Sequence, residues 1–360
     1  MINTLKDVVN ALTAPEIFIT VCAIAFLLAL RTRGIWRSRP AAILGLLAVV
    51  FLGVSMLDPN FALIVKKPDN VPIVAMLFLV GFFLWLSMSQ AYDNDDRIAA
   101  GQPPREASDG EAEKTWVWPD LVYTELLAMV IGMIILVVWS LLLKAPIEEP
   151  ANPARTPNPS KAPWYFLGLQ EMLVYYDPWL AGVVFPSLII VGLMAIPYID
   201  TNPKGNGYFT FKERHWEITI FLVGFIVLWC SLIALGTFLR GPNWNFFGPY
   251  EFWDVNKLVP LNNINLSEIM WIKVFKKSLP NFWLTREIFG LAIVGFYIGV
   301  LPLVLSQTLL RRFFEKMGMA RYVIGVNLAL IMLSLPIKMY LRWIFNLKYI
   351  VAIPEIAFNI

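Results

Sequence analysis

The sequence predicts an all-α, polytopic membrane protein with about eight transmembrane helices. Of its 360 residues, 58% are hydrophobic and 15% are charged, whereas soluble domains contain about 45–50% apolar and about 25% charged residues. The apolar residues gather in uninterrupted runs close to the roughly 20 residues that cross a bilayer. A membrane-spanning backbone must satisfy its own hydrogen bonds, and no run alternates like a barrel strand, so we expect helices. This excludes a soluble enzyme and a single-anchor protein.

The predicted spans cover residues 16–30, 41–57, 72–90, 121–143, 179–198, 217–239, 287–310 and 322–341. The first span is the shortest, and an interfacial helix is its alternative. Because consecutive spans alternate sides, four connecting segments share one side: 31–40, 91–120, 199–216 and 311–321. Basic residues are about twice as dense on this side as on the other, which predicts that it is cytoplasmic and that both termini face outward.

Two connections divide the chain. Residues 91–119 are polar and largely acidic, and this composition predicts a flexible cytoplasmic linker. Residues 144–163, on the outward side, contain six prolines, which fix φ and remove donors, so we expect an extended, stiff loop. The predicted organisation is a module of three helices in 1–90, the linker in 91–119, a core in 120–240, and an aromatic-rich outward loop with two helices in 241–360.

A motif closes the proline-rich loop. Residues 151–167 read A-N-P-A-R-T-P-N-P-S-K-A-P-W-Y-F-L. This resembles the quinol-oxidation loop in the C-terminal half of cytochrome b, and in subunit IV of complexes where cytochrome b is split. The family pattern is A-N-P-x-x-T-P, then six residues of which the last is proline, and then E-W-Y-F-L. The preceding span also opens as in subunit IV, with Pro119-Asp120-Leu121, and the resemblance covers roughly 116–240.

One departure from the family concerns proton transfer. The tetrad Pro-Glu-Trp-Tyr is replaced by Ala162–Tyr165, so the glutamate credited with accepting a quinol proton is absent. If 163–175 is helical, Glu171 shares a face with Trp164, Leu167 and Gly168. We therefore predict that Glu171 accepts the proton; the alternative is a carboxylate at the water interface. The missing glutamate also resembles bacterial variants thought to use menaquinol, which favours menaquinol as the substrate.

The resemblance implies that the end of the loop lines a quinol pocket. The residues expected to form its wall are Pro163, Trp164, Tyr165, Phe166 and Leu167. Aromatic residues are also enriched at membrane boundaries, which is the alternative explanation for the three rings.

Two further residues are candidates on the cytoplasmic side. Asp120 aligns with a family aspartate near the quinone-reduction site, and a helix N-cap explains it equally well. His215 precedes a span, and we expect an ordinary surface residue, with proton uptake or a lipid-headgroup contact as alternatives.

Haem content follows from the histidine count. The resemblance implies two b haems, each held by two histidines, whereas this chain has one histidine in total. We therefore expect that the chain ligates no haem and that the haems belong to a separate N-terminal, b6-like cytochrome b subunit. No metal ligands are expected, because both cysteines lie inside apolar runs.

The resemblance further implies a Rieske iron–sulfur protein, a c-type cytochrome subunit and a dimeric complex in a bacterial-type energy-transducing inner membrane. Membrane lipids are expected partners, and nucleic acid is not. The leading interpretation is a subunit IV-like membrane subunit of a quinol:cytochrome c oxidoreductase, inactive alone. One alternative is a structural or quinone-anchoring subunit of another respiratory complex with a degenerate quinol site. A transporter is disfavoured by the scarcity of intramembrane charge.

Overall fold

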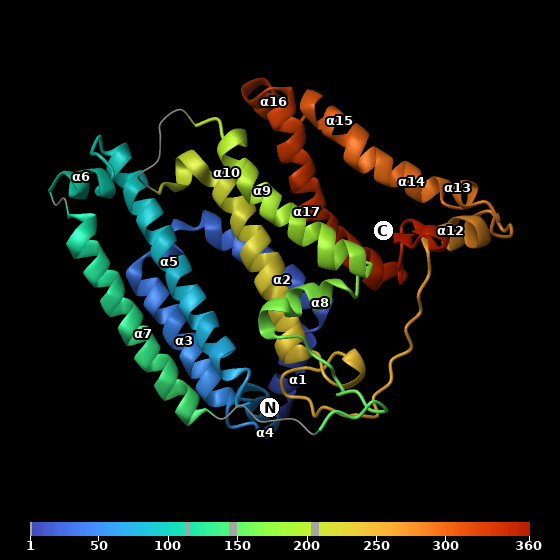
Figure 1. Ribbon diagram of the computed structural model, residues 1–360, viewed down its shortest axis with the longest axis horizontal. Coiled ribbons are helices and arrows are strands. Elements are labelled where there is room, and N and C mark those ends of the chain that lie inside the picture. The colour runs from blue at the N-terminus through green and yellow to red at the C-terminus, as the bar shows by residue number, and fades with distance from the viewer. Residues whose placement is uncertain (1, 113–114, 144–149, 203–208) are drawn as a thin grey trace.

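The computed structural model describes residues 2–112, 115–143, 150–202 and 209–360. Apart from a short hairpin, β1 (Ala352–Ile353) with β2 (Phe358–Asn359), it is built of helices (Figure 1). The predicted all-α, polytopic fold class is thus confirmed. In the described residues seven helices are long and apolar enough to cross a membrane: Ser38–Ser55 (α3), Val71–Ala99 (α5), Val117–Leu142, Leu180–Ile199, Phe211–Leu239, Ile288–Gln307 and Met319–Phe345 (α17).

Several of these spans contain π-helical turns, so the labelled α-helices cover only part of their length. The α-helical parts of these spans are α7 (Val122–Leu142), α9 (Phe185–Ile199), α10 (Phe211–Leu222), α11 (Ser231–Ala234), α14 (Ile288–Gly295) and α15 (Leu301–Gln307). Short helices lie between the spans: α4 (Pro59–Val65), α6 (Arg105–Ala112), α8 (Leu167–Met172), α12 (Leu266–Glu268), α13 (Trp283–Arg286) and α16 (Arg311–Met317).

The first predicted span is the second arm of a bent pair. Helix α1 (Ile2–Leu12) and helix α2 (Pro15–Arg31) meet at 78°. Pro15 occupies the first turn of α2, where its missing N–H costs nothing and its fixed φ favours a helix start. The same residue cannot continue α1, so the chain turns there.

The span Phe211–Leu239 lies at the centre of the molecule. Its lower half joins α2, α8 and α17 in one buried cluster that includes Ile19, Leu232 and Met339. Its upper half joins α2 and α5 in a second cluster with Leu30, Met88 and Ile218. The N-terminal helices therefore pack directly on the span that also holds the proline-rich loop.

The four connections predicted to share one side do meet at one end of the molecule, the basic end. It consists of the described parts of 31–40, 91–120, 199–216 and 311–321, and lies at the top of Figure 1 for α6, α10 and α16. The contacts are Arg33 Nη2–Asp96 Oδ1 at 2.6 Å, the Lys212 amide to Asp95 at 3.1 Å, Arg214 to Asp200 at 2.9 and 3.0 Å, and the rings of Trp216 and Phe313 at 5.9 Å.

The opposite end, the loop end, gathers the N-terminus, residues 56–70, the proline-rich loop and the segment after Leu239. Lys6 pairs with Asp58 at 2.5 Å, and Ser55 hydrogen bonds to Tyr250 at 2.7 Å. Residues 144–149 of the predicted proline-rich loop lie outside the described residues.

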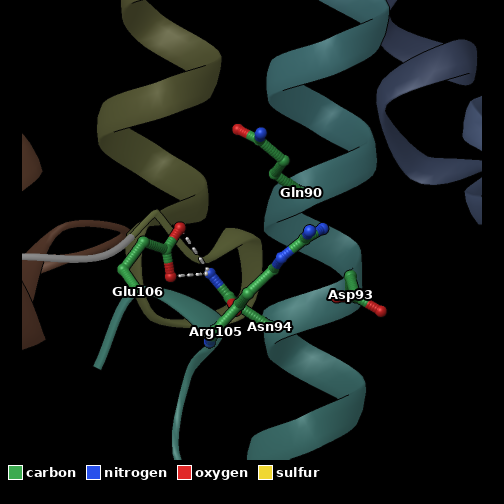
Figure 2. A pocket seen from close by; sticks show the side chains of 5 residues that line it. All are labelled: Gln90, Asp93, Asn94, Arg105 and Glu106. Atoms are coloured by element: carbon green, nitrogen blue, oxygen red, sulfur yellow. Dashed lines mark hydrogen bonds between the residues drawn. The ribbon is translucent and has the colours of Figure 1, made fainter. Parts of the chain in front are cut away.

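The predicted flexible linker needs correction over the part that the structure describes. Helix α5 continues to Ala99, and α6 follows after a short turn. Asn94 and Asp95 are buried in spite of their polarity. Figure 2 shows the reason for Asn94, whose Nδ2 donates to both carboxylate oxygens of Glu106 at 3.1 and 2.8 Å. Composition indicated too few apolar groups to fold, but Asn94 is satisfied by Glu106 on the same connection and Asp95 by the Lys212 amide on another.

Candidate functional site

The aromatic stretch Trp164–Phe166 forms one 3₁₀ turn that leads into α8. Pro163 sits just before it with φ −51° and ψ 146°, a φ close to the value that the proline ring fixes. Trp164 is half-buried, Tyr165 and Phe166 are 48% and 49% exposed, and Leu167 is buried at 3%. Neighbouring rings lie 5.6 Å and 4.5 Å apart. The stretch therefore presents a wall of aromatic rings at the protein surface, and the buried Leu167 side chain anchors it.

Close approach of two helices fixes this wall in place. A Cβ on Gly168 would lie 3.4 Å from Ile233 and 3.5 Å from Trp229, and one on Gly236 would lie 3.5 Å from Leu167. Small residues at such contacts let helix backbones approach closely in membrane proteins. Of the four residues expected on one helical face of 163–175, Leu167, Gly168 and Glu171 lie in α8 and are buried, whereas Trp164 lies in the preceding 3₁₀ turn.

Side-chain hydrogen bonds clamp the proline-rich loop against the rest of the loop end. Gln170 brackets the loop, because its Oε1 accepts the Ala162 amide at 2.8 Å and its Nε2 donates to the Ser160 carbonyl at 2.9 Å. Asn158 exchanges two hydrogen bonds with Asn243, at 2.9 and 2.6 Å. Sequence reasoning missed Gln170 and Asn243, since neither stands in the motif and their partners are fixed only by the fold.

Glu171 is completely buried and forms an ion pair with Arg240. The guanidinium Nη2 lies 2.6 Å from Oε1, and Nε lies 3.2 and 3.0 Å from the two carboxylate oxygens. Burial opposes the charged form of Arg240, but the attraction and hydrogen bonds of Glu171 raise its pKa above the ordinary value. The alternative of a carboxylate at the water interface is wrong, because the Glu171 side chain has 0% exposure. Arg240, which sequence reasoning did not single out, directly follows the Phe211–Leu239 span.

A second anchor lies just beyond α8. The Asp177 carboxylate accepts hydrogen bonds from the Tyr349 hydroxyl at 3.3 Å and from Asn359 Nδ2 at 3.0 Å. Trp179 Nε1 donates to the Asn359 carbonyl at 3.2 Å. The β1–β2 segment therefore seals the edge of the module that carries the aromatic wall.

The two candidates of the basic end lie far from this wall. Asp120 is exposed in the turn before α7, and within the described residues the helix start has no side-chain cap, so the predicted N-cap role is not seen. His215 is exposed near the start of α10; its Nδ1 lies 3.2 Å from the Lys212 carbonyl and its ring 5.1 Å from that of Trp216. This is the expected surface position. A polar cleft of about 260 Å³ at the same end is lined by Gln90, Asp93, Asn94, Arg105 and Glu106 (Figure 2).

Comparison with known proteins identifies the loop end. Residues 150–248 match the family described as Cytochrome b(C-terminal)/b6/petD. The match is confined to this stretch and covers less than half of the chain. The cytochrome b module thus comprises the described loop, α8, the Leu180–Ile199 and Phe211–Leu239 spans, and the segment to Gly248, and it contains both members of the Glu171–Arg240 pair. The resemblance predicted from the loop motif for roughly 116–240 is confirmed from residue 150 onward.

A cytochrome b of Allochromatium vinosum (strain ATCC 17899 / DSM 180 / NBRC 103801 / NCIMB 10441 / D) is 31% identical to this chain over 93 residues. The similarity covers 24% of this chain and 22% of that protein's length. No solved structure matches the chain.

The cytochrome b module does not fit a haem with two imidazole ligands. The chain has one histidine, and its ring is exposed at the basic end, paired with a backbone carbonyl and a tryptophan ring. Within the described residues, no group of three or more histidine, cysteine, aspartate or glutamate side chains forms a metal site.

Proposed function

We propose that this chain is the subunit IV-like membrane subunit of a quinol:cytochrome c oxidoreductase and contributes one wall of the outward quinol-oxidation site. The observation that carries the proposal is the clamped loop, which holds Trp164–Phe166 open to one side within residues that match the cytochrome b C-terminal family. An exposed row of aromatic rings on a rigid support is suited to binding a flat, apolar ring.

In this assignment Pro163, Trp164, Tyr165 and Phe166 shape the pocket, and Leu167 anchors it. The substrate is a quinol, with menaquinol favoured by the absence of the family glutamate. Two electrons leave the quinol toward one-electron acceptors: a Rieske iron–sulfur protein and a b haem. Both belong to partner subunits, because this chain cannot supply the four imidazoles of two b haems. Asp120, at the opposite end, is proposed to lie near the quinone-reduction site.

The remaining partners are a b6-like cytochrome b subunit, a c-type cytochrome and membrane lipids, in a dimeric complex of a bacterial-type inner membrane with both termini outward. The experiment is purification of the tagged chain from its native membrane. We expect co-purification of a b haem spectrum and a Rieske electron-spin signal, together with quinol-dependent reduction of a one-electron acceptor. A complex that lacks both signals contradicts the proposal.

A second candidate is a structural or quinone-anchoring subunit with a degenerate site. It is favoured by one observation: Arg240 directs three hydrogen-bond contacts at the two carboxylate oxygens of Glu171, the geometry of a structural ion pair. Under the main proposal, Glu171 accepts the quinol proton by releasing one of these hydrogen bonds.

The substitution Glu171→Gln separates the two candidates. It preserves size while removing the titratable group, so under the main proposal we expect quinol oxidation by the assembled complex to fall at least about 100-fold. Haem content and subunit composition of the variant serve as the control for assembly. Unchanged quinol oxidation in the assembled variant would rule out Glu171 as the proton acceptor.

A further inference from the structure

A cluster of buried and half-buried polar residues joins α8 to the end of the central span and the loop after it. Glu171 comes from α8, Tyr175 from the turn after it, Thr237 and Arg240 from the end of the Phe211–Leu239 span, and Trp253 from the outward loop. None of these five residues belongs to the loop motif. The inference drawn from them rests on the proposed function, because it concerns the protons that quinol oxidation releases.

Unpartnered polar atoms concentrate in this cluster. Four buried side-chain atoms have no hydrogen-bond partner within the described part of the chain, and three of them belong to Tyr175, Thr237 and Trp253. Tyr175 and Thr237 are 1% and 3% exposed. Buried donors and acceptors are satisfied in nearly all folded proteins by protein, ordered water or ligand. The three atoms therefore point to a polar passage that takes up water or a mobile proton.

Lys161 lies at the loop side of this passage. Its Nζ donates to the Thr237 carbonyl at 2.9 Å and stands 4.9 Å from the centre of the Trp253 ring. Lys161 forms no ion pair among the described residues, although Glu171 and Arg240 are close enough to influence it. The amine therefore lies between the end of the central span and the Trp253 ring, within electrostatic range of the buried pair.

The surroundings of Lys161 make its charge labile. Burial, and then the positive charges of Lys67 and Arg240, lower its pKa from the ordinary 10.5 to about 7, while Glu171 acts in the opposite direction. Lys67 comes from the segment after α4, Glu171 from α8, and Arg240 from the end of the central span. A neutral amine is a competent proton acceptor, and one that titrates near the working pH can also release the proton.

We propose that Lys161 is a proton-relay residue that carries a quinol proton from the buried cluster to the outward water. Both O–H bonds of the quinol break, one after the other; each time the proton passes through the polar passage and an N–H bond forms at Lys161 Nζ. The two electrons go to the one-electron acceptors of the partner subunits. The new N–H bond then breaks as outward water takes the proton, which restores the neutral amine.

The test is the pH profile of quinol oxidation by the purified complex, from pH 5.5 to 9, for the wild type, Lys161→Met and Lys161→Arg. We expect an inflection near pH 7 in the wild type and its loss in both variants, with the rate at neutral pH lowered about tenfold. The arginine variant keeps a cation that can reach Thr237 and Trp253 but cannot lose its proton. If Lys161→Arg retains the wild-type rate and profile, Lys161 is a structural cation and the proposal is overturned.

Lys257 provides a matched control. Its Nζ also donates to a carbonyl, that of Phe246 at 2.9 Å, and stands 4.3 Å from the ring of Phe247. Lys257, however, has an ion-pair partner, since Glu251 lies 3.8 Å away. We expect Lys257→Met and Lys257→Arg to leave the pH profile unchanged. An equal loss of the inflection in the Lys257 variants would overturn the assignment to Lys161.

A second readout does not depend on turnover. Because the pKa of Lys161 is lowered in the folded chain, the unfolded chain binds more protons between about pH 7 and 10.5, so the stability of the wild type should rise with pH across this window. We expect thermal unfolding of Lys161→Met to lack this rise. Absence of the rise in the wild type overturns the relay, whereas a rise in a complex that does not oxidise quinol overturns the proposed function and leaves Lys161 a titrating structural group.

Discussion

The two ends of the molecule use charge in opposite ways. At the loop end, Glu171 and Arg240 are 0% and 12% exposed and carry one another's charge away from water. At the basic end, Arg33 and Asp96 are 44% and 66% exposed, and their short contact is open to solvent and salt. A buried pair is costly to separate, whereas an exposed pair contributes little. The ion pair at the loop end therefore holds α8 against the central span, whereas the ion pair at the basic end lies on the surface.

The substitution Arg240→Met tests this comparison most severely. It leaves the Glu171 carboxylate buried without its partner, so we expect a loss of about 3–5 kcal/mol of stability. The loss would be measured as a lower midpoint of thermal unfolding of the purified complex and as a smaller amount of this chain in the complex.

The double variant Glu171→Leu/Arg240→Met is the control. Because replacing both members of a buried pair by apolar residues is often neutral, most of the stability should return. If the single variant unfolds at the wild-type temperature, the pair does not hold α8 against the central span, and the contrast between the two ends disappears.

A smaller effect is expected from Gly241→Ala, at the same end. The added Cβ would lie 2.5 Å from the Phe247 ring and 3.1 Å from Trp253. Overpacking of this kind costs about 1–3 kcal/mol, and we expect it to displace the segment after Leu239 from the Glu171–Arg240 pair. The measurements are thermal unfolding and protease cleavage after residue 241.

Gly182→Ala is the matched control, because no atom lies within 4 Å of a Cβ at Gly182. We expect this variant to behave like the wild type. Equal sensitivity of both variants would show that packing at Gly241 is not tighter than elsewhere in the module.

The sequence was sufficient to predict the features that depend on local composition. Apolar runs predicted the spans, and the loop motif predicted the family that the comparison matches over residues 150–248. Periodicity placed Leu167 and Glu171 on one helical face, and the structure adds that both are buried. What composition cannot supply is the identity of a partner 69 residues away, so Arg240 was not foreseen.

The same limitation explains the error at the basic end. Residues 91–99 are polar, and polar composition indicates a linker when the residues are considered alone. Their burial depends on partners such as the Lys212 amide, 117 residues further along the chain, which accounts for the helical continuation of α5.

The smallest predicted effect concerns Asp200 and Arg214 at the basic end. The two side chains form a double hydrogen bond at 2.9 and 3.0 Å but are 27% and 20% exposed, so we expect Asp200→Asn to cost no more than about 1 kcal/mol. The hydrogen bonds from Arg214 hold the pKa of Asp200 below its ordinary 3.8. The stabilisation should therefore be present above about pH 4 and disappear as the pH falls through the lowered pKa of the folded chain.

Thermal unfolding of the wild type and Asp200→Asn as a function of pH measures this contribution, and the two curves should converge in acid. Added salt should shrink the difference at neutral pH, because partly exposed charges are screened. The same salt should leave the Arg240→Met loss almost unchanged, since that pair lies out of reach of the ions. If salt reduced the Arg240→Met and Asp200→Asn losses of stability equally, the charges at the two ends would be equally accessible to water. Glu171 would then be an accessible carboxylate.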